Sequence, residues 1–181
     1  MIKTEIIAGA ENIFNQFSET CNAMAENVFF YQPENKWSVA ENMQHLIIST
    51  NTTTLAYNLP KFLVRWIGGT PNRHSRSYDE VKEKYYKKLS DGGRASARFI
   101  PKPIQVKYGK QKLLDNWSRA TSKFIISLTA KRTEDDLDNY LAKHPLLGRI
   151  TLRELCYFTI FHTEHHLQSI KKITQPHDTI L

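Results

Sequence analysis

Residues 151–172 read TLRELCYFTIFHTEHHLQSIKK and predict a long amphipathic helix. Thr151 and Glu154 have the spacing of a capping box, in which two side chains satisfy backbone N–H groups that the start of a helix leaves without partners. Apolar and small polar residues then recur three or four positions apart along one face: Leu152, Leu155, Thr159, His162, His166, Ser169 and Ile173. We therefore expect a helix from about Thr151 to Lys172.

A second capping box begins the stretch from Trp37 to Leu46, which reads WSVAENMQHL. Here Ser38 is the capping residue and Glu41 lies three positions later. The apolar stripe that follows contains Ala40, Met43, Leu46 and Ile47 and continues to Leu55. This pattern predicts another long helix.

Two further helices are expected at about 3–30 and 110–130, and two short ones at about 78–89 and 134–141. A long connection, punctuated by Gly and Pro, covers about 68–109 between the second and third long helices. No segment alternates as a strand would, although 99–108 could be locally extended. The expected class is all-α, a four-helix bundle with one long connection.

The bulk composition suits one soluble domain over residues 1–181. A chain of 181 residues with 40% hydrophobic residues can build a single core. Met1–Ala10 does not resemble a secretory leader, and no run approaches the roughly 20 apolar residues of a membrane span. Cys21 and Cys156 have no CxxC partner, so we expect free buried thiols and a cytoplasmic location.

The positive charge belongs to one segment. The whole chain carries a net charge of +7, whereas residues 65–112 alone hold 13 basic and 4 acidic residues. A solvated basic loop is the simplest interpretation. Alternatively, its arginines could clamp a carboxylate of a substrate: Arg73, Arg76, Arg94 and Arg98. Nucleic-acid binding, with Tyr85, Tyr86 and Phe99 stacking on bases, is disfavoured because no binding motif accompanies the charge.

Three histidines are candidates for a metal site. His162 and His166 are four residues apart, so their β-carbons lie roughly 5–6 Å apart on one helix face. His45 is on the apolar stripe of the long helix that begins after Ser38, where a buried imidazole needs a hydrogen-bond or metal partner. Three neutral histidines would leave a coordination position open, as catalytic sites do. However, an HxxxH pair also occurs by chance, and an inward histidine is often satisfied by a core hydrogen bond.

Several neighbours of these histidines are polar. Glu41 is interpreted as the capping acid rather than as a ligand, and His165 as a residue behind the ligands or on the bundle surface. Three hydroxyl groups lie one turn from the histidines and could orient the rings: Ser49, Thr159 and Ser169.

Three blocks of the sequence together resemble the DinB/YfiT-like superfamily. Trp37–Leu46 resembles its W-S-x-x-E-x-x-x-H-L signature, and His144–Glu154 its H-P-x-x-G-x-x-T-x-x-E motif. The run from His162 to His166 resembles the H-x-x-H-H motif that follows. The resemblance implies a four-helix bundle whose metal ligands fall on His45, His162 and His166.

The resemblance also implies a set of functions. Relatives include bacillithiol- or mycothiol-dependent transferases, thiol-dependent isomerases and proteins described as metal-dependent hydrolases. We favour an S-transferase that activates a low-molecular-weight thiol at a divalent metal for transfer to a small-molecule substrate. The alternatives are a metal-dependent hydrolase and a non-catalytic module that binds a metal or small ligand. Zinc or nickel is the favoured metal, and iron or manganese remains an alternative. No protein residue is assigned as catalytic. A homodimer is expected.

Overall fold

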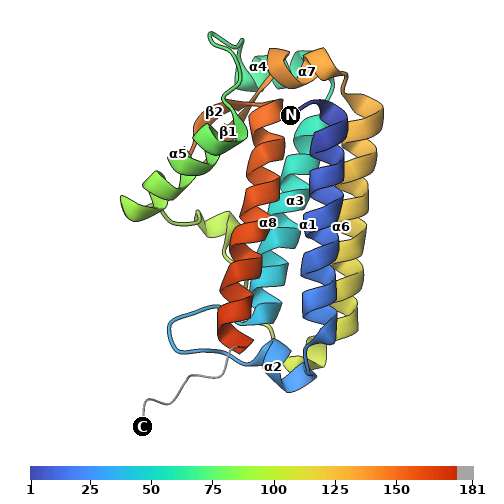
Figure 1. Cartoon of the computed structure of the whole chain (residues 1–181), viewed down its shortest axis with the longest axis vertical. Coiled ribbons are helices and arrows are strands. Elements are labelled where there is room, and N and C mark those ends of the chain that lie inside the picture. Colours follow the sequence, from blue (N-terminus) through green and yellow to red (C-terminus); the bar gives the residue numbers. More distant parts are fainter. Residues whose placement is uncertain (175–181) are drawn as a thin grey trace.

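Four long helices lie side by side in the computed structural model, which describes residues 1–174 (Figure 1). They are α1 (Lys3–Ala23), α3 (Val39–Asn58), α6 (Lys110–Lys131) and α8 (Leu152–Thr174). Both α1 and α3 contact α6 and α8, which closes the four-helix bundle. The predicted all-α bundle is confirmed, while residues 175–181 of the predicted domain lie outside the described residues. Within the described part of the chain, every helix is too short or too polar to cross a membrane.

Both predicted capping boxes are present. The Ser38 hydroxyl accepts from the Glu41 backbone N–H at 3.1 Å, and the Glu41 carboxylate accepts from the Ser38 N–H at 2.8 Å. At the start of α8 the corresponding distances between Thr151 and Glu154 are 3.2 and 3.1 Å. These reciprocal bonds set where α3 and α8 begin, and therefore the positions of their histidines along the bundle axis.

Aromatic side chains fill the centre of the bundle. Phe14 packs edge-on against Trp117 at 5.4 Å and Phe124 at 5.7 Å between ring centroids. Cys21 and Cys156 are free and buried, as predicted. Burial raises the pKa of each thiol to about 12, so both stay protonated near neutral pH.

The connections contain shorter elements. They are α2 (Glu26–Phe30), α4 (Lys61–Gly68), α5 (Tyr78–Ser90), η1 (Ala97–Phe99), η2 (Val106–Tyr108) and α7 (Glu134–Asn139). Neither α4 nor the break between α1 and α2 was expected from the sequence. Gly68, the last residue of α4, lies so close to β1 (Leu141–His144) that a β-carbon there would be 1.9 Å from the Leu141 carbonyl oxygen.

A small hairpin corrects the expectation that no strand would form. β1 pairs antiparallel with β2 (Gly148–Thr151), from Leu141 opposite Thr151 to His144 opposite Gly148. Gly148 has a φ of +76°, a conformation that glycine adopts without strain. The strands are four residues long and show no clear alternation, so their sequence carries little strand signal.

The hairpin and α5 lie outside the bundle on the side of α8 (Figure 1). Every residue from Thr151 to Thr163 is consequently buried, whereas the second half of α8 has exposed positions. The sequence predicted one buried stripe on this helix. Its first half is instead covered on all sides, because α1, α3, α5 and the hairpin all contact α8.

Candidate metal centre

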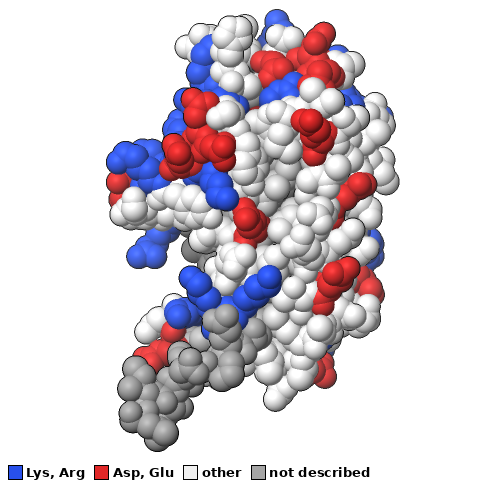
Figure 2. All heavy atoms as spheres, in the orientation of Figure 1, with Lys and Arg blue, Asp and Glu red and all other residues white. Residues whose placement is uncertain are grey.

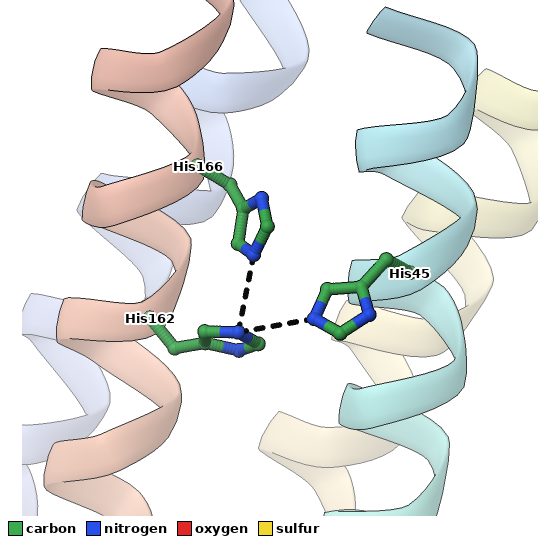
Figure 3. A group of neighbouring side chains, drawn as sticks. All are labelled: His45, His162 and His166. Carbon is green, nitrogen blue, oxygen red and sulfur yellow. Dashed lines mark hydrogen bonds between the residues drawn. The ribbon is translucent and has the colours of Figure 1, made fainter. Parts of the chain in front are cut away.

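The rings of His45, His162 and His166 point toward one another between α3 and α8 (Figure 3). Nε2 of His162 lies 3.1 Å from Nε2 of His45 and 3.1 Å from Nε2 of His166. One nitrogen from each ring lies within 4.8 Å of the others, and all three residues are buried. The three histidines that the sequence predicted to share a site are therefore adjacent.

Hydrogen bonds at the far side of two rings fix their tautomers. His45 Nδ1 donates to the Phe99 carbonyl at 2.7 Å, and His166 Nδ1 donates to the Asn42 side-chain oxygen at 2.7 Å. In the neutral state each of these rings carries its one proton on Nδ1. Their Nε2 lone pairs are thus directed at the same point, next to Nε2 of His162.

This arrangement fits a divalent metal better than a hydrogen-bonded cluster. A single proton on His162 Nε2 can serve only one of its two 3.1 Å contacts, which leaves the Nε2 lone pair of the other ring without a donor. Neighbouring nitrogens held ~2.0–2.1 Å from one ion in tetrahedral or octahedral geometry lie about 2.8–3.4 Å apart. The two 3.1 Å distances at His162 lie in that range, and all three nitrogens lie within 4.8 Å of one another, so the group could hold a metal ion.

Burial keeps the rings neutral, as metal ligands must be. Loss of hydration lowers the pKa of His45, although the bond to the Phe99 carbonyl partly opposes the shift. The pKa values of His162 and His166 lie well below the usual histidine range, because both rings are fully buried and face other histidines. The group therefore presents lone pairs rather than positive charge near neutral pH.

Aromatic rings pack around the three histidines. Trp37 lies 4.9 Å from His45 and stacks parallel to His166 at 6.2 Å between centroids. Phe158 stacks on His162 at 4.6 Å. These contacts hold the rings in place and exclude water from the sides of the group.

A cavity of about 680 Å³ adjoins the histidines, and its lining includes all three of them. Its walls come from α3, α5, α8, the loop before α3, the hairpin and residues 93–100. This volume suits a small organic molecule. The histidines are therefore accessible to a ligand on one side while being packed on the others.

The comparisons with known proteins agree with this architecture. Residues 11–170 match the family model of the DinB superfamily. The chain belongs to the DinB superfamily. No curated protein and no solved structure matches it. A DinB-superfamily bundle with a buried three-histidine group is compatible with a metal-dependent enzyme.

The polar neighbours expected in this DinB-superfamily site have different roles. Thr159 donates to the Leu155 carbonyl at 2.9 Å and Ser169 to the His165 carbonyl at 2.9 Å, so both bond within α8. Glu41 is the capping acid, as interpreted from the sequence. Ser49 lines the cavity.

His165 lies beside the site but outside the three-histidine group. It is partly exposed, lines the cavity and lies 5.8 Å from the Tyr86 ring. His165 is thus not part of the three-histidine group, and its place in the cavity lining was not predicted from the sequence.

The residues that orient the rings were missed. Asn42 precedes His45 by three positions and therefore shares its helix face, a signal that could have found it. Its amide nitrogen donates to the carbonyls of Trp37 at 3.2 Å and Ser38 at 2.8 Å, which turns its oxygen toward His166. The Phe99 carbonyl comes from the long connection, and no sequence signal marks it.

The four arginines considered as clamps separate into two pairs. Arg73 binds the fully buried Glu154 carboxylate through two bonds of 2.6 and 2.8 Å, and Arg76 also contacts it at 3.5 Å. Arg94 and Arg98 line the cavity instead. The first pair thus anchors the connection to the start of α8, and only the second pair is placed to meet a ligand.

The aromatic residues considered for base stacking are not displayed together. Tyr85 is buried and packs against Phe158 and Phe161, and Phe99 lines the cavity. Tyr86 is exposed. This arrangement gives no continuous stacking surface of the kind that single-stranded nucleic acid uses.

His144 was assigned no partner from the sequence, yet it lines the cavity. Its Nδ1 accepts from the backbone N–H groups of Leu146 at 3.2 Å and Leu147 at 3.1 Å. Burial lowers its pKa to about 4, and the nearby charge of Arg98 adds to the shift. His144 is therefore a neutral ring in the wall of the cavity, with its proton on Nε2.

Proposed function

We propose that the chain is a metal-dependent S-transferase that activates a low-molecular-weight thiol and transfers it to an electrophilic small molecule. The observation that carries the proposal is the convergence of three histidine Nε2 atoms in the lining of a cavity of about 680 Å³. A divalent metal bound there would keep its full charge and would deprotonate a coordinating thiol.

The chain's own side chains hold and shield this site. The Phe99 carbonyl and the Asn42 oxygen keep a proton on Nδ1 of His45 and His166 and so keep Nε2 of both rings available. The Trp37 ring packs against His45 and His166 and limits the access of water to these two rings. A thiol that reaches the base of the cavity is therefore held among neutral, weakly hydrated groups.

The reacting thiol has to come from a cosubstrate. Both cysteines are buried, and the pKa of each thiol is about 12. The Cys156 sulfur is also hydrogen-bonded to the Tyr57 hydroxyl at 2.9 Å. Neither residue offers a thiolate to a substrate in the cavity, which favours an external thiol such as bacillithiol or mycothiol.

A metal-dependent hydrolase is the second candidate, since a bound metal can also lower the pKa of water. Metal hydrolases commonly add a carboxylate as general base, as in the HExxH motif. Among the described residues, the charged side chains that line this cavity are all basic: Lys36, Arg94, Arg98 and Lys143. A thiol that loses its proton on coordination needs no such base, so the lining favours thiol transfer.

The test begins with elemental analysis of untagged protein, beside the His162→Ala/His166→Ala double variant. His74→Ala is the matched control, because His74 is exposed and lies outside the three-histidine group. We expect about one equivalent of a transition metal in the wild type and the control, and none in the double variant. Absence of metal from the wild type, even after reconstitution with zinc, nickel, iron and manganese, would overturn the proposal.

The activity is then measured with 1-chloro-2,4-dinitrobenzene as electrophile and a panel of bacillithiol, mycothiol, cysteine and glutathione. The same protein is tested with 4-nitrophenyl acetate without a thiol. Thiol-dependent turnover that disappears in His45→Ala supports the transferase. Thiol-independent ester cleavage would assign a hydrolase, and metal binding without turnover in either assay would assign a binding module.

A further inference from the structure

The mouth and the base of the cavity differ in chemistry. The base contains the three histidines and the Phe158 ring, all buried. Exposed cations line the cavity farther out: Lys36, Arg94, Arg98 and Lys143. They come from the loop before α3, from residues 93–100 and from β1, so three separate segments bring positive charge to one opening.

These four cations differ from the basic residues that pair with carboxylates. Arg73 and Arg76 are engaged by Glu154, and Lys82 pairs with Glu164 at 3.1 Å. Within residues 1–174, no carboxylate forms an ion pair with any of the four cations at the cavity. Figure 2 shows basic and acidic side chains over α5 and a hollow in the surface beneath it. The opening is thus lined by four positively charged side chains that are not held in ion pairs within the described part of the chain.

Arg98 lies against the Phe99 ring, which also lines the cavity. Its guanidinium lies 4.6 Å from the centroid of the Phe99 ring, and the Phe99 carbonyl accepts the proton of His45 Nδ1. Gly93, at the start of the same segment, donates to the Lys88 carbonyl at 2.8 Å. A β-carbon at Gly93 would be 2.5 Å from that oxygen, so the tight turn fixes where this segment begins.

We propose that this cavity binds a small organic anion, whose carboxylate or phosphate lies at Arg94 and Arg98 while its apolar body extends toward the three histidines. Guanidinium groups match the planar, two-oxygen geometry of both anions. Trp37, Phe99 and Phe158 supply apolar surface in the lining of the cavity. The proposal that the cavity binds an anion does not depend on the proposed function. The assignment of this anion as the thiol or as the electrophile does rest on the proposed function.

The substrate class follows from this division of the cavity. A neutral apolar molecule would leave the four cations at the mouth without a partner, and a small inorganic anion would leave the aromatic walls uncovered. A molecule of a carboxylate or phosphate joined to an apolar or aromatic group contacts both regions at once. In the proposed reaction, such a molecule would place its reacting atom near the histidines.

The test compares 2-naphthoate and 2-naphthyl phosphate with the neutral amide 2-naphthamide by isothermal titration calorimetry. The full chain is used as purified and again after metal removal, because a carboxylate could bind a metal directly. We expect at least one anion to bind about 10-fold more tightly than the amide, which is the low end for charge-assisted bonds at an exposed site. Whichever anion binds more tightly identifies the preferred group.

The Arg94→Gln/Arg98→Gln variant should lose that preference and keep its affinity for the amide. Lys102→Gln/Lys107→Gln is the matched control, because it removes two charges from the same connection outside the cavity lining. Circular dichroism and thermal unfolding establish that both variants are folded. An equal loss of affinity in both variants would show general electrostatic attraction and overturn the proposal.

Two further outcomes would also overturn it: anions that bind no more tightly than the amide, or a preference that survives Arg94→Gln/Arg98→Gln and disappears on metal removal. These results are separate from the test of the proposed function. Metal content and thiol-dependent turnover can hold while the anion preference fails, and the preference can hold in a chain that does not catalyse transfer.

Discussion

Asn42 offers the sharpest test of how the metal centre is built. Its side-chain oxygen accepts a hydrogen bond from His166 Nδ1 at 2.7 Å, and Asn42 is only 4% exposed. Removing an acceptor that orients a metal-binding histidine typically weakens metal affinity 10–100-fold, which corresponds to about 1.4–2.7 kcal/mol. We expect this loss in Asn42→Ala. The ring of His166 then lacks the bond that fixes its tautomer and orientation.

The assay is a competition titration of zinc against a chelator of known affinity at pH 7.5, with urea unfolding of the metal-free proteins in parallel. Asn42→Asp keeps an oxygen acceptor but loses the amide donors to the Trp37 and Ser38 carbonyls. It should therefore lose stability while retaining zinc affinity close to that of the wild type. Ser49→Ala, which changes another polar residue of α3 at the cavity, is the control and should bind zinc normally.

Two results would refute this reasoning. One is a folded Asn42→Ala protein that binds zinc within about threefold of the wild type, a change smaller than the effect of an orienting partner. The other is an Asn42→Asp protein that loses as much zinc affinity as the alanine variant. In that case, the amide donors at the start of α3 would matter, and not the acceptor on His166.

Three further predictions concern stability. Gly68→Ala places a β-carbon 1.9 Å from the Leu141 carbonyl oxygen and should cost about 1–3 kcal/mol in urea unfolding; an unchanged midpoint would show that α4 moves freely away from β1. Arg73→Gln removes two bonds to the fully buried Glu154 carboxylate and should cost about 3 kcal/mol, with zinc affinity retained. The pKa of His144 is about 4 in the folded protein and near 6.5 when unfolded, so only the unfolded chain gains this proton as pH falls from 7.5 to 5. Stability should therefore fall by about 2 kcal/mol more in the wild type than in His144→Asn, and identical pH profiles would contradict the assignment.

The starts of α3 and α8 and the ligand candidates were predictable because their signals are local. A capping box involves residues three positions apart, so the pairs Ser38–Glu41 and Thr151–Glu154 indicate where α3 and α8 begin. The four-residue spacing of His162 and His166 places both on one helix face for the same reason. The small-molecule substrate, the thiol and the homodimer stay predictions.

Short elements held by distant contacts were not predictable. The helix α4 has eight residues, and Arg65 within it lies over the Tyr140 ring at 5.3 Å. The hairpin has strands of four residues. Segments of these lengths have little intrinsic preference for one structure, so packing against the rest of the chain selects it.

The sequence by itself determined the all-α class, the start of the two helices that carry the histidines, and the three candidate ligands. Only the tertiary structure decided what those ligands contact. The Phe99 carbonyl reaches His45 across 54 positions of sequence and Asn42 reaches His166 across 124. Tertiary packing likewise directs Arg73 to Glu154 and places Arg98 at the cavity. The physical reason is that helix periodicity and capping act within one or two turns, whereas ring orientation and charge pairing depend on which distant segments the folded core brings together.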